Sequence, residues 1–195
     1  MLALDVQRGD VAIAIGSSGL HSNGYSLARH VAFDVLGMDV HDHVADFGRS
    51  LGEELLEPTR IYSRDLLELY RSCEVHSVSH ITGGGIAANV ARVLPDWAAL
   101  DIARSSWVLT PVFTFLMAGG SIERLEAERT FNMGIGMVAF VAAGQERKAV
   151  DVLQSAGQSA WVLGAVRDRH ADEVGDAAAK GGSGGAVFLV GDYRS

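Results

Sequence analysis

The sequence predicts an α/β fold of the α+β type, in which helices pack against a β-sheet. Short apolar runs typical of buried strands alternate along the chain with segments that have the periodicity of amphipathic helices. In two places a strand, a glycine-rich loop and a helix follow one another. The chain has 195 residues, of which 48% are hydrophobic and 21% charged, and this is enough to bury the core of a single domain.

The first half of the chain alternates between the two kinds of element. The expected elements are a buried strand at 10–15, a helix after it, a surface connection or short helix at 37–50, helices at 51–57 and 62–72, a strand at 75–81, a helix at 86–94 and a strand at 97–102. Leu27, Val31 and Val35 are spaced to lie on one face of the first helix. Ser22 or Asn23 is its expected N-cap.

The second half continues the alternation and ends in a glycine-rich stretch. The expected elements are a helix at 112–117, a helix opened by Ser121 with Arg124 and Glu128, a strand at 134–142, a helix at 145–155 and strands at 161–166 and 186–190. Pro111 suits the first turn of its helix, because a proline lacks only a donor that is unpaired there. Residues 171–185 hold five glycines, which is typical of a mobile loop.

Composition argues against several kinds of partner. The 24 acidic and 16 basic residues give a net charge of −8, which opposes binding to nucleic acid or to an anionic membrane surface. Apolar runs such as 137–143 are much shorter than the ~20 residues that cross a bilayer. Cys73 is the only cysteine, and residues 1–10 lack the pattern of a signal peptide. We therefore expect a cytoplasmic protein.

Residues 16–26 (GSSGLHSNGYS) form the most informative segment for chemistry. Its glycines let backbone amides approach a ligand, and the helix that follows presents unpaired N–H groups to an anion such as phosphate. His21 and Asn23 would add a titratable donor and a neutral amide. The alternative is that the serines and Asn23 make only turns and a cap, with His21 on the surface.

Two further segments repeat the combination of glycine with a polar side chain. In residues 80–85 (HITGGG), His80 and Thr82 are expected beyond a strand end, where ligands gather in open α/β sheets. The alternative there is a tight turn with a core histidine. In residues 130–137 (TFNMGIGM), Asn132 either bonds its own turn, which the pattern alone favours, or holds an amide or hydroxyl of a ligand.

Metal sites and several common motifs find little support. His41 and His43 would share a face of an extended chain, but no third ligand accompanies them, so a solvated loop is favoured. Glu53, Glu54 and Glu57 are typical of the charged face of a helix. The sequence has no GxxxxGK[ST] loop, no GxSxG elbow and no GxGxxG in a suitable context, which argues against P-loop, hydrolase and Rossmann proteins.

Four phrases in the same order resemble one enzyme family. GLHSNGYSLARH at 19–30, GEELLEPTRIY at 52–62, HITGGG at 80–85 and TFNMGIGM at 130–137 are similar to phosphoribosylformylglycinamidine cyclo-ligase, also called aminoimidazole ribonucleotide synthetase. The resemblance covers about residues 9–166. It implies the C-terminal domain of that superfamily, with a mixed β-sheet layered with helices.

The resemblance implies a ligase of purine biosynthesis and assigns site residues. In the implied reaction ATP phosphorylates the amide oxygen of formylglycinamidine ribonucleotide, and an internal nitrogen then closes the imidazole ring. His21 and His80 would be the catalytic residues, in proton transfer or in neutralising phosphoryl charge. The implied substrate- and phosphate-binding residues are Ser22, Asn23, Gly24, Thr82, Gly83, Gly84, Gly85, Thr130 and Asn132.

The resemblance also sets expectations for domains, cofactors and partners. Residues 1–9 would lead in from an N-terminal ATP-binding domain absent from the chain, 10–170 would form the substrate-side domain, and 171–195 a glycine-rich loop and terminal strand. That N-terminal domain would bind most of the ATP and Mg²⁺, and the full-length enzyme would be a homodimer. The chain alone would not turn over. The alternatives are a non-catalytic phosphate-binding or scaffolding domain, or a sibling ATP-dependent enzyme of the superfamily.

Overall fold

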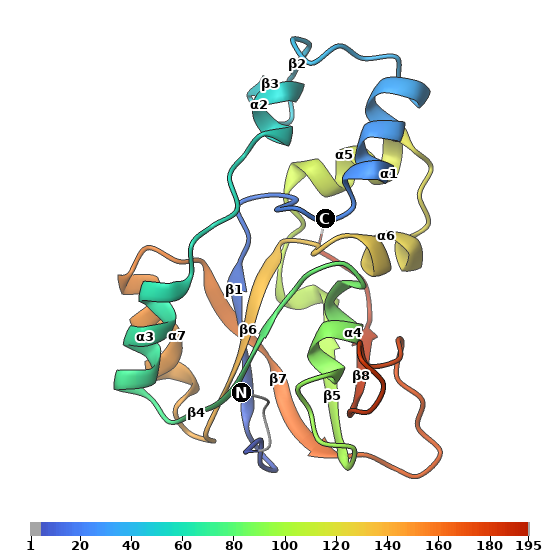
Figure 1. Ribbon diagram of the computed structural model, residues 1–195. Helices are drawn as coiled ribbons and strands as arrows, with labels where there is room; N and C mark the ends of the chain where they lie inside the picture. The colour runs from blue at the N-terminus through green and yellow to red at the C-terminus, as the bar shows by residue number, and fades with distance from the viewer. Residues whose placement is uncertain (1–4, 195) are drawn as a thin grey trace.

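A computed structural model describes residues 5–194, in which a six-stranded sheet carries helices on both faces (Figure 1). The strands lie in the order β4–β6–β1–β7–β5–β8, with bounds β1 Val11–Gly16, β4 Val75–His80, β5 Ala98–Ala103, β6 Ile135–Val141, β7 Ala160–Asp168 and β8 Ala186–Val190. All neighbours are antiparallel except β5 and β8, which are parallel. The predicted α+β class with a mixed sheet is confirmed.

Helices and short elements fill the connections. They are α1 Tyr25–Arg29, a π-helical turn His30–Val35, the ribbon strands β2 His43–Val44 and β3 Arg49–Ser50, α2 Leu51–Leu55, α3 Ser63–Ser72, α4 Gly85–Ala91, a 3₁₀ turn Arg104–Ser106, α5 Pro111–Gly119, α6 Arg124–Thr130 and α7 Glu146–Ser155. Pro111 occupies the first turn of α5, as predicted. Each strand and each helix expected from periodicity has a counterpart, displaced by a few residues at its ends.

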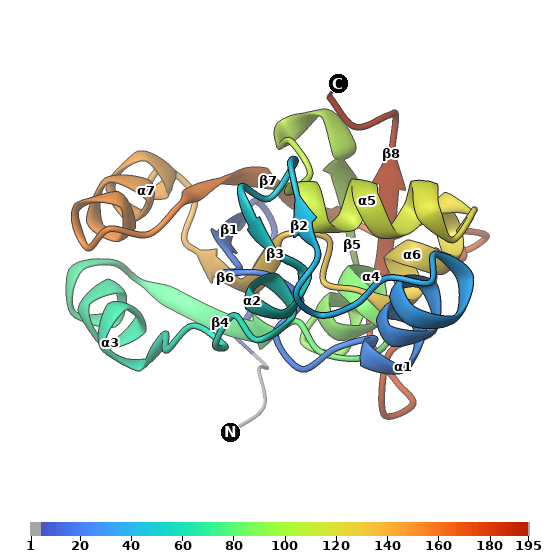
Figure 2. The ribbon, with the colours of Figure 1, turned by 90° about the horizontal axis from the view of Figure 1, so that it is seen from above.

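Two apolar cores lie on the two faces of the sheet. Helices α3 and α7 lie together over one face, whereas α4, α5 and α6 cover the other (Figures 1 and 2). Side chains of β1 alternate between these cores, with Ile13 and Ile15 in the first and Ala12 and Ala14 in the second. Because both faces of β1 are covered, its sequence is apolar throughout.

The first helix begins differently from the prediction. Its N-cap is Gly24, in the left-handed region at φ 69°, and not Ser22 or Asn23. The Asn23 side chain instead donates to the Ile81 carbonyl across the sheet edge (3.4 Å). Val35, predicted to lie on the buried face, is 53% exposed because the helix changes to a π turn before reaching it.

Residues 37–57 form an excursion above the sheet, with the short ribbon β2–β3 followed by α2 (Figure 1). Helix α2 starts with a capping box, in which Glu53 N–H donates to Ser50 Oγ and Ser50 N–H donates to Glu53 Oε2. It ends at Leu55, two residues before the predicted end at 57, and Pro58 follows. His41 and His43 are exposed on this excursion.

Residues 171–185 contain no helix or strand, and most of them are exposed, but the backbone of Lys180 and Gly185 bonds to α4 and the turn after it. Gly185 N–H donates to the carbonyls of Ala91 and Leu94 at the end of α4 (3.1 and 3.0 Å). A Cβ added to Gly184 would lie 2.2 Å from the Ala91 oxygen, so the glycine permits this close approach. We call residues 171–185 the C-terminal strap.

Of the lead-in expected at residues 1–9, residues 1–4 lie outside the described part of the chain. Among residues 5–194, no helix combines the length and apolar character needed to cross a bilayer.

Candidate functional site

The three glycine-bearing segments meet at one end of the sheet. Because β1 and β4 both run antiparallel to β6, the ends of β1 and β4 lie beside the start of β6. Gly16 pairs with Ile135, and His80 pairs with Met137. The segments that follow β1 and β4 and precede β6 are therefore neighbours, although they are far apart in the sequence (Figure 1). The topology brings the predicted site residues to a common edge.

Asn132 ties the first segment to the third. Its Nδ2 donates to the carbonyls of Gly19 and Leu20 (2.9 and 3.2 Å), and its Oδ1 accepts from Gly134 N–H and Ser17 Oγ (2.8 and 3.1 Å). The side chain is fully buried. Asn132 thus bonds its own turn, as its pattern favoured, and also fixes the loop after β1, which the pattern did not reveal.

His21 is buried between this loop and β6. It is 4% exposed, has φ 54°, and its ring centroid lies 6.0 Å from that of Tyr62. Tyr62 O–H donates to the Gly16 carbonyl (2.9 Å), which anchors the end of β1. A non-glycine residue in the left-handed region is uncommon and costs free energy, so the surrounding contacts hold His21 in place. The alternative of a surface His21 is wrong.

The hydrogen bonds of His21 define its chemistry. Ser18 N–H donates to Nε2 (3.1 Å), so the neutral ring carries its proton on Nδ1. Among the described residues Nδ1 has no partner. Burial, followed by the nearby His80 and Arg60, lowers the pKa of His21 to about 4. Near neutral pH the side chain is an uncharged N–H donor without an acceptor.

Asn89, on α4, organises the HITGGG loop. Its Nδ2 donates to the carbonyls of Thr82 and Gly85 (3.0 and 2.8 Å), and Thr82 Oγ1 donates to its Oδ1 (3.1 Å). The Asn89 side chain is fully buried, so these hydrogen bonds fix the loop conformation from the interior of the domain. His80 precedes this loop on the exposed side, and burial of part of its ring, followed by Arg92, lowers its pKa.

The glycines of this loop have different roles. A Cβ on Gly85 would lie 1.7 Å from the Glu128 carbonyl oxygen, so Gly85 serves the packing of α4 against α6. Gly83 has no atom within 4 Å of such a Cβ, and both Gly83 and Gly84 are exposed. Only the first two glycines therefore leave backbone open to a ligand.

Two candidate residues stand apart from this network. Ser22 is exposed, and no side-chain hydrogen bond to another described residue involves it. Thr130 donates to Glu126 on its own helix (3.1 Å), while its methyl group lies against Gly24. Gly24 itself is packed against the Phe131 ring, so its role is in the helix start and not in an open cradle.

Sequence reasoning missed several residues that build the site. Tyr62 and Asn89 were read only as parts of helices, and Lys180 was read only as part of a glycine-rich stretch. Lys180 Nζ donates to the Gly83 carbonyl and to Thr82 Oγ1 (2.9 and 3.2 Å). The one available signal was Asn89, a polar residue inside the apolar run IAANVARV.

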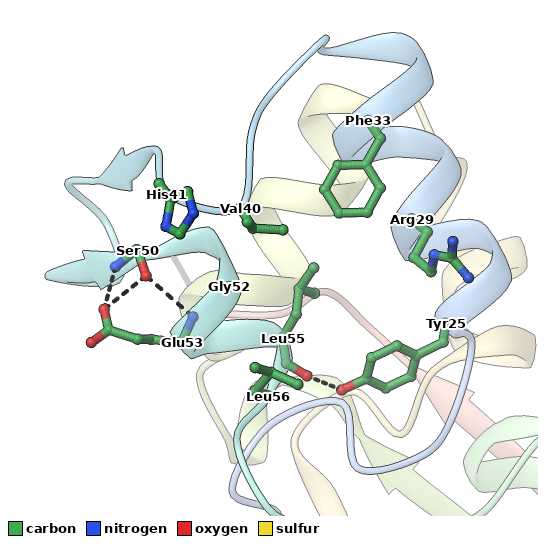
Figure 3. Close-up of a pocket in the computed structure, with 10 residues that line it drawn as sticks. All are labelled: Tyr25, Arg29, Phe33, Val40, His41, Ser50, Gly52, Glu53, Leu55 and Leu56. Atoms are coloured by element: carbon green, nitrogen blue, oxygen red, sulfur yellow. Dashed lines mark hydrogen bonds between the residues drawn. The ribbon is translucent and has the colours of Figure 1, made fainter.

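Two cavities lie near these segments. One, of about 300 Å³, is lined by Gly16, Ser17 and Gly134 and by the indole rings of Trp107 and Trp161. The other, of about 430 Å³, lies between α1 and α2 and is mostly apolar (Figure 3). It contains none of the predicted site residues. The smaller cavity adjoins the first and third segments, through Gly16 and Ser17 and through Gly134, and no residue of the HITGGG segment lines it.

Within the described part of the chain, the end of the sheet lacks the side chains of a metal site. Across residues 5–194, no group of three or more His, Cys, Asp or Glu side chains is arranged to hold a metal ion. The side chains at the sheet end are amides, hydroxyls and neutral imidazoles, which do not form the oxygen-rich carboxylate set that Mg²⁺ prefers. These residues do not fit a resident Mg²⁺ site.

Sequence comparison relates the chain to named proteins. Residues 7–177 match the family described as AIR synthase related protein, C-terminal domain. A Streptomyces fradiae protein with the provisional name phosphoribosylformylglycinamidine cyclo-ligase is 50% identical over 96% of this chain and 99% of its own length. The phosphoribosylformylglycinamidine cyclo-ligase of Desulfatibacillum aliphaticivorans is 44% identical over 85% of this chain and 48% of its own length. The chain thus spans about half of this and similar relatives.

Structural comparison finds the same architecture in more distant proteins. The crystal structure of thiamine-monophosphate kinase from Stenotrophomonas maltophilia K279a matches 95% of this chain and 52% of its own, with a TM-score of 0.58 and 18% identity. The hydrogenase maturation protein HypE of E. coli matches 84% of this chain and 45% of its own, with a TM-score of 0.53 and 18% identity. These matches concern the fold alone. The sequence matches show that this chain belongs to the AIR synthase related protein, C-terminal domain family.

Proposed function

We propose that this chain is the substrate-side domain of an ATP-dependent cyclo-ligase, which converts formylglycinamidine ribonucleotide to aminoimidazole ribonucleotide in purine biosynthesis. Family membership and relatives named as phosphoribosylformylglycinamidine cyclo-ligases support this proposal. The observation that carries it is the convergence of the three motif segments at one end of the sheet, where Asn132 joins the first to the third and Asn23 donates to Ile81 of the second.

In this proposal the chain holds and orients the ribonucleotide. The open backbone at Gly83 and Gly84 would bind its phosphate, and the cavity beside Trp107 and Trp161 would take its uncharged part. The Nδ1–H of His21 is buried and unpartnered, and it would donate to the oxygen that is phosphorylated and then leaves when the loop after β1 moves to admit the substrate. Because the His21 pKa lies near 4, we favour this neutral donor over proton transfer or charge neutralisation.

ATP supplies the phosphoryl group in the proposed reaction, and ADP and phosphate leave when the ring closes. We place ATP and Mg²⁺ mainly on an N-terminal ATP-binding domain, in line with relatives that are about twice as long. That domain would be the direct partner of this chain, within a cytoplasmic homodimer. Holding the two reacting ends of the substrate together would contribute much of the rate of ring closure.

Complementation tests the proposal. The chain would be mixed with the N-terminal half of the Desulfatibacillum aliphaticivorans relative, and ring closure would be followed with formylglycinamidine ribonucleotide and ATP. We expect turnover by the mixture and none by either part alone. His21→Ala should reduce kcat roughly hundredfold because it removes the donor.

His41→Ala is the matched control, since His41 is exposed and lines the other cavity. Its activity should equal that of the unmodified chain. Thermal unfolding of each variant separates a folding defect from a lost function. Equal activity of the His21→Ala and unmodified mixtures would refute the role of His21. No turnover by the mixture, with turnover of thiamine monophosphate instead, would favour a sibling enzyme, and no turnover of either would favour a binding or scaffolding domain.

A further inference from the structure

The C-terminal strap is bonded to the domain at several points along its length, although most of its residues are exposed. At its start, the Arg167 guanidinium donates to both carboxylate oxygens of Glu173 (2.8 Å each). Farther along, Leu189 N–H of β8 donates to Asp176 Oδ2 (2.7 Å). Lys180 N–H donates to the Ala88 carbonyl on α4 (3.0 Å). The backbone of Lys180 is therefore fixed beside the helix that follows the HITGGG loop.

The Lys180 ammonium lies on the open part of that loop. Nζ donates to the Gly83 carbonyl and to Thr82 Oγ1 (2.9 and 3.2 Å), which leaves one of its three N–H groups uncommitted. Among residues 5–194, no carboxylate lies within ion-pair distance of it. In a chain with net charge −8, this is an unneutralised cation next to open glycine backbone.

The histidines of the site cannot supply that charge near neutral pH. Burial lowers the pKa of His21 to about 4, and it also lowers the pKa of His80. A phosphate group leaving water is stabilised most by charge-assisted hydrogen bonds. A fully charged ammonium at the edge of the loop can donate a charge-assisted hydrogen bond to phosphate, whereas a neutral imidazole can donate only an uncharged one.

We propose that Lys180 binds the phosphate group of the ligand at this site. The C-terminal strap is then part of the candidate functional site. The proposal rests on the proposed function for the identity of the ribonucleotide, but the ligand chemistry it needs is only a phosphate group on an organic molecule. Lys180 lies outside residues 7–177, which match the family. The strap thus adds a specificity residue beyond the part of the chain that matches the family.

Selective labelling tests this contact in the chain as it stands. The sequence has two lysines, Lys148 and Lys180, so acylation of amines followed by mass spectrometry reports each one separately. Lys148 lies on α7, over the opposite face of the sheet, and is the internal control. Ribose 5-phosphate at ten times its Kd should slow acylation of Lys180 about tenfold and leave Lys148 unchanged. Unphosphorylated ribose should protect neither lysine.

ATP without metal forms a second arm of this experiment. Protection of Lys180 at a lower concentration of ribose 5-phosphate than of ATP assigns the contact to the ribose phosphate, and the reverse order assigns it to the phosphate in transfer. Equal acylation of Lys180 with and without saturating ligands would overturn the proposal.

Variants separate binding from loop support. In the complemented enzyme, Lys180→Gln should raise the KM for the ribonucleotide about tenfold and change kcat less than about twofold, because one charge-assisted hydrogen bond is lost. Lys180→Arg keeps the charge and should recover most of the affinity, and Lys148→Gln should match the unmodified chain. The salt dependence of KM should become shallower in Lys180→Gln, an effect that loop support alone would not produce.

The two proposals fail in different ways. Ring closure by the complemented chain with an unchanged KM in Lys180→Gln would refute the role of Lys180 and leave the function standing. Protection of Lys180 by ribose 5-phosphate without any ring closure would refute the function and leave the phosphate contact standing.

Discussion

At the scale of single residues, His21 has the most unusual environment in the site. It combines a left-handed backbone, near-complete burial and an Nδ1 without a partner. Each of these features costs free energy, and together they are retained where the fold must present a donor. The sequence could nominate His21 from its glycine-rich surroundings, but its neutral state depends on burial that only the fold reveals.

The lowered pKa of His21 predicts a pH-dependent stability. In the unfolded chain the pKa is near 6.5 and in the folded chain about 4, so the unfolded state binds more protons between these values. Stability is therefore full above pH 6.5 and decreases as the pH falls towards 4. The shift corresponds to a loss of about 3 kcal/mol at its completion.

His21→Asn is the variant for this measurement, because asparagine tolerates the left-handed region and does not titrate. Urea unfolding of both proteins at several pH values gives the difference that belongs to His21, since all other groups are shared. The free energy of unfolding of the unmodified chain should fall relative to that of His21→Asn between pH 6.5 and 4. A constant difference over this range would contradict the buried neutral state.

At the scale of elements, packing at the start of α4 determines which glycines of the HITGGG loop are exposed. Three consecutive glycines look equivalent in the sequence, but the structure divides them. Gly85 has φ 72° and contacts the Glu128 carbonyl, whereas Gly83 faces open space. The close contact involves Glu128 of α6, which lies more than forty residues later in the chain, so local pattern could not distinguish these glycines.

A matched pair of substitutions tests this division. Gly85→Ala should lower the free energy of unfolding by at least about 2 kcal/mol, because its Cβ meets a backbone oxygen and its φ is positive. Gly83→Ala should change it by less than about 0.5 kcal/mol, because nothing contacts its Cβ. Denaturant titration of both variants gives the comparison. Equal effects of the two substitutions would show that the loop packs differently from this account.

The sequence predicts elements that depend on local patterns better than boundaries that depend on distant contacts. Apolar runs and helical spacing predicted β1, α3 and α7 because those signals are local and both sheet faces are covered. The N-cap of α1 was mispredicted because Asn23 reaches the Ile81 carbonyl, a partner 58 residues away. Local propensity gives way wherever a side chain finds a partner in another segment.

At the scale of the whole molecule, strand order makes the site. The antiparallel neighbours β1–β6–β4 bring the ends of β1 and β4 to the start of β6. Asn132 then joins the loop after β1 to the turn before β6, and Asn23 joins the same loop to the end of β4. The sequence predicted that the three motifs matter, through resemblance, but it could not predict strand order or the contact of Lys180 with Gly83. Both depend on tertiary pairing over long separations.

The central claim is that these three segments bind one anionic ligand, and amide chemical shifts measured during titration with ribose 5-phosphate test it most directly. We predict shifts confined to residues 17–24, 82–84 and 132–134 and to Lys180, with one shared dissociation constant. Shifts around Tyr25, Phe33 and Leu55, which line the other cavity, would contradict it, as would separate dissociation constants for the three segments or no shifts at all.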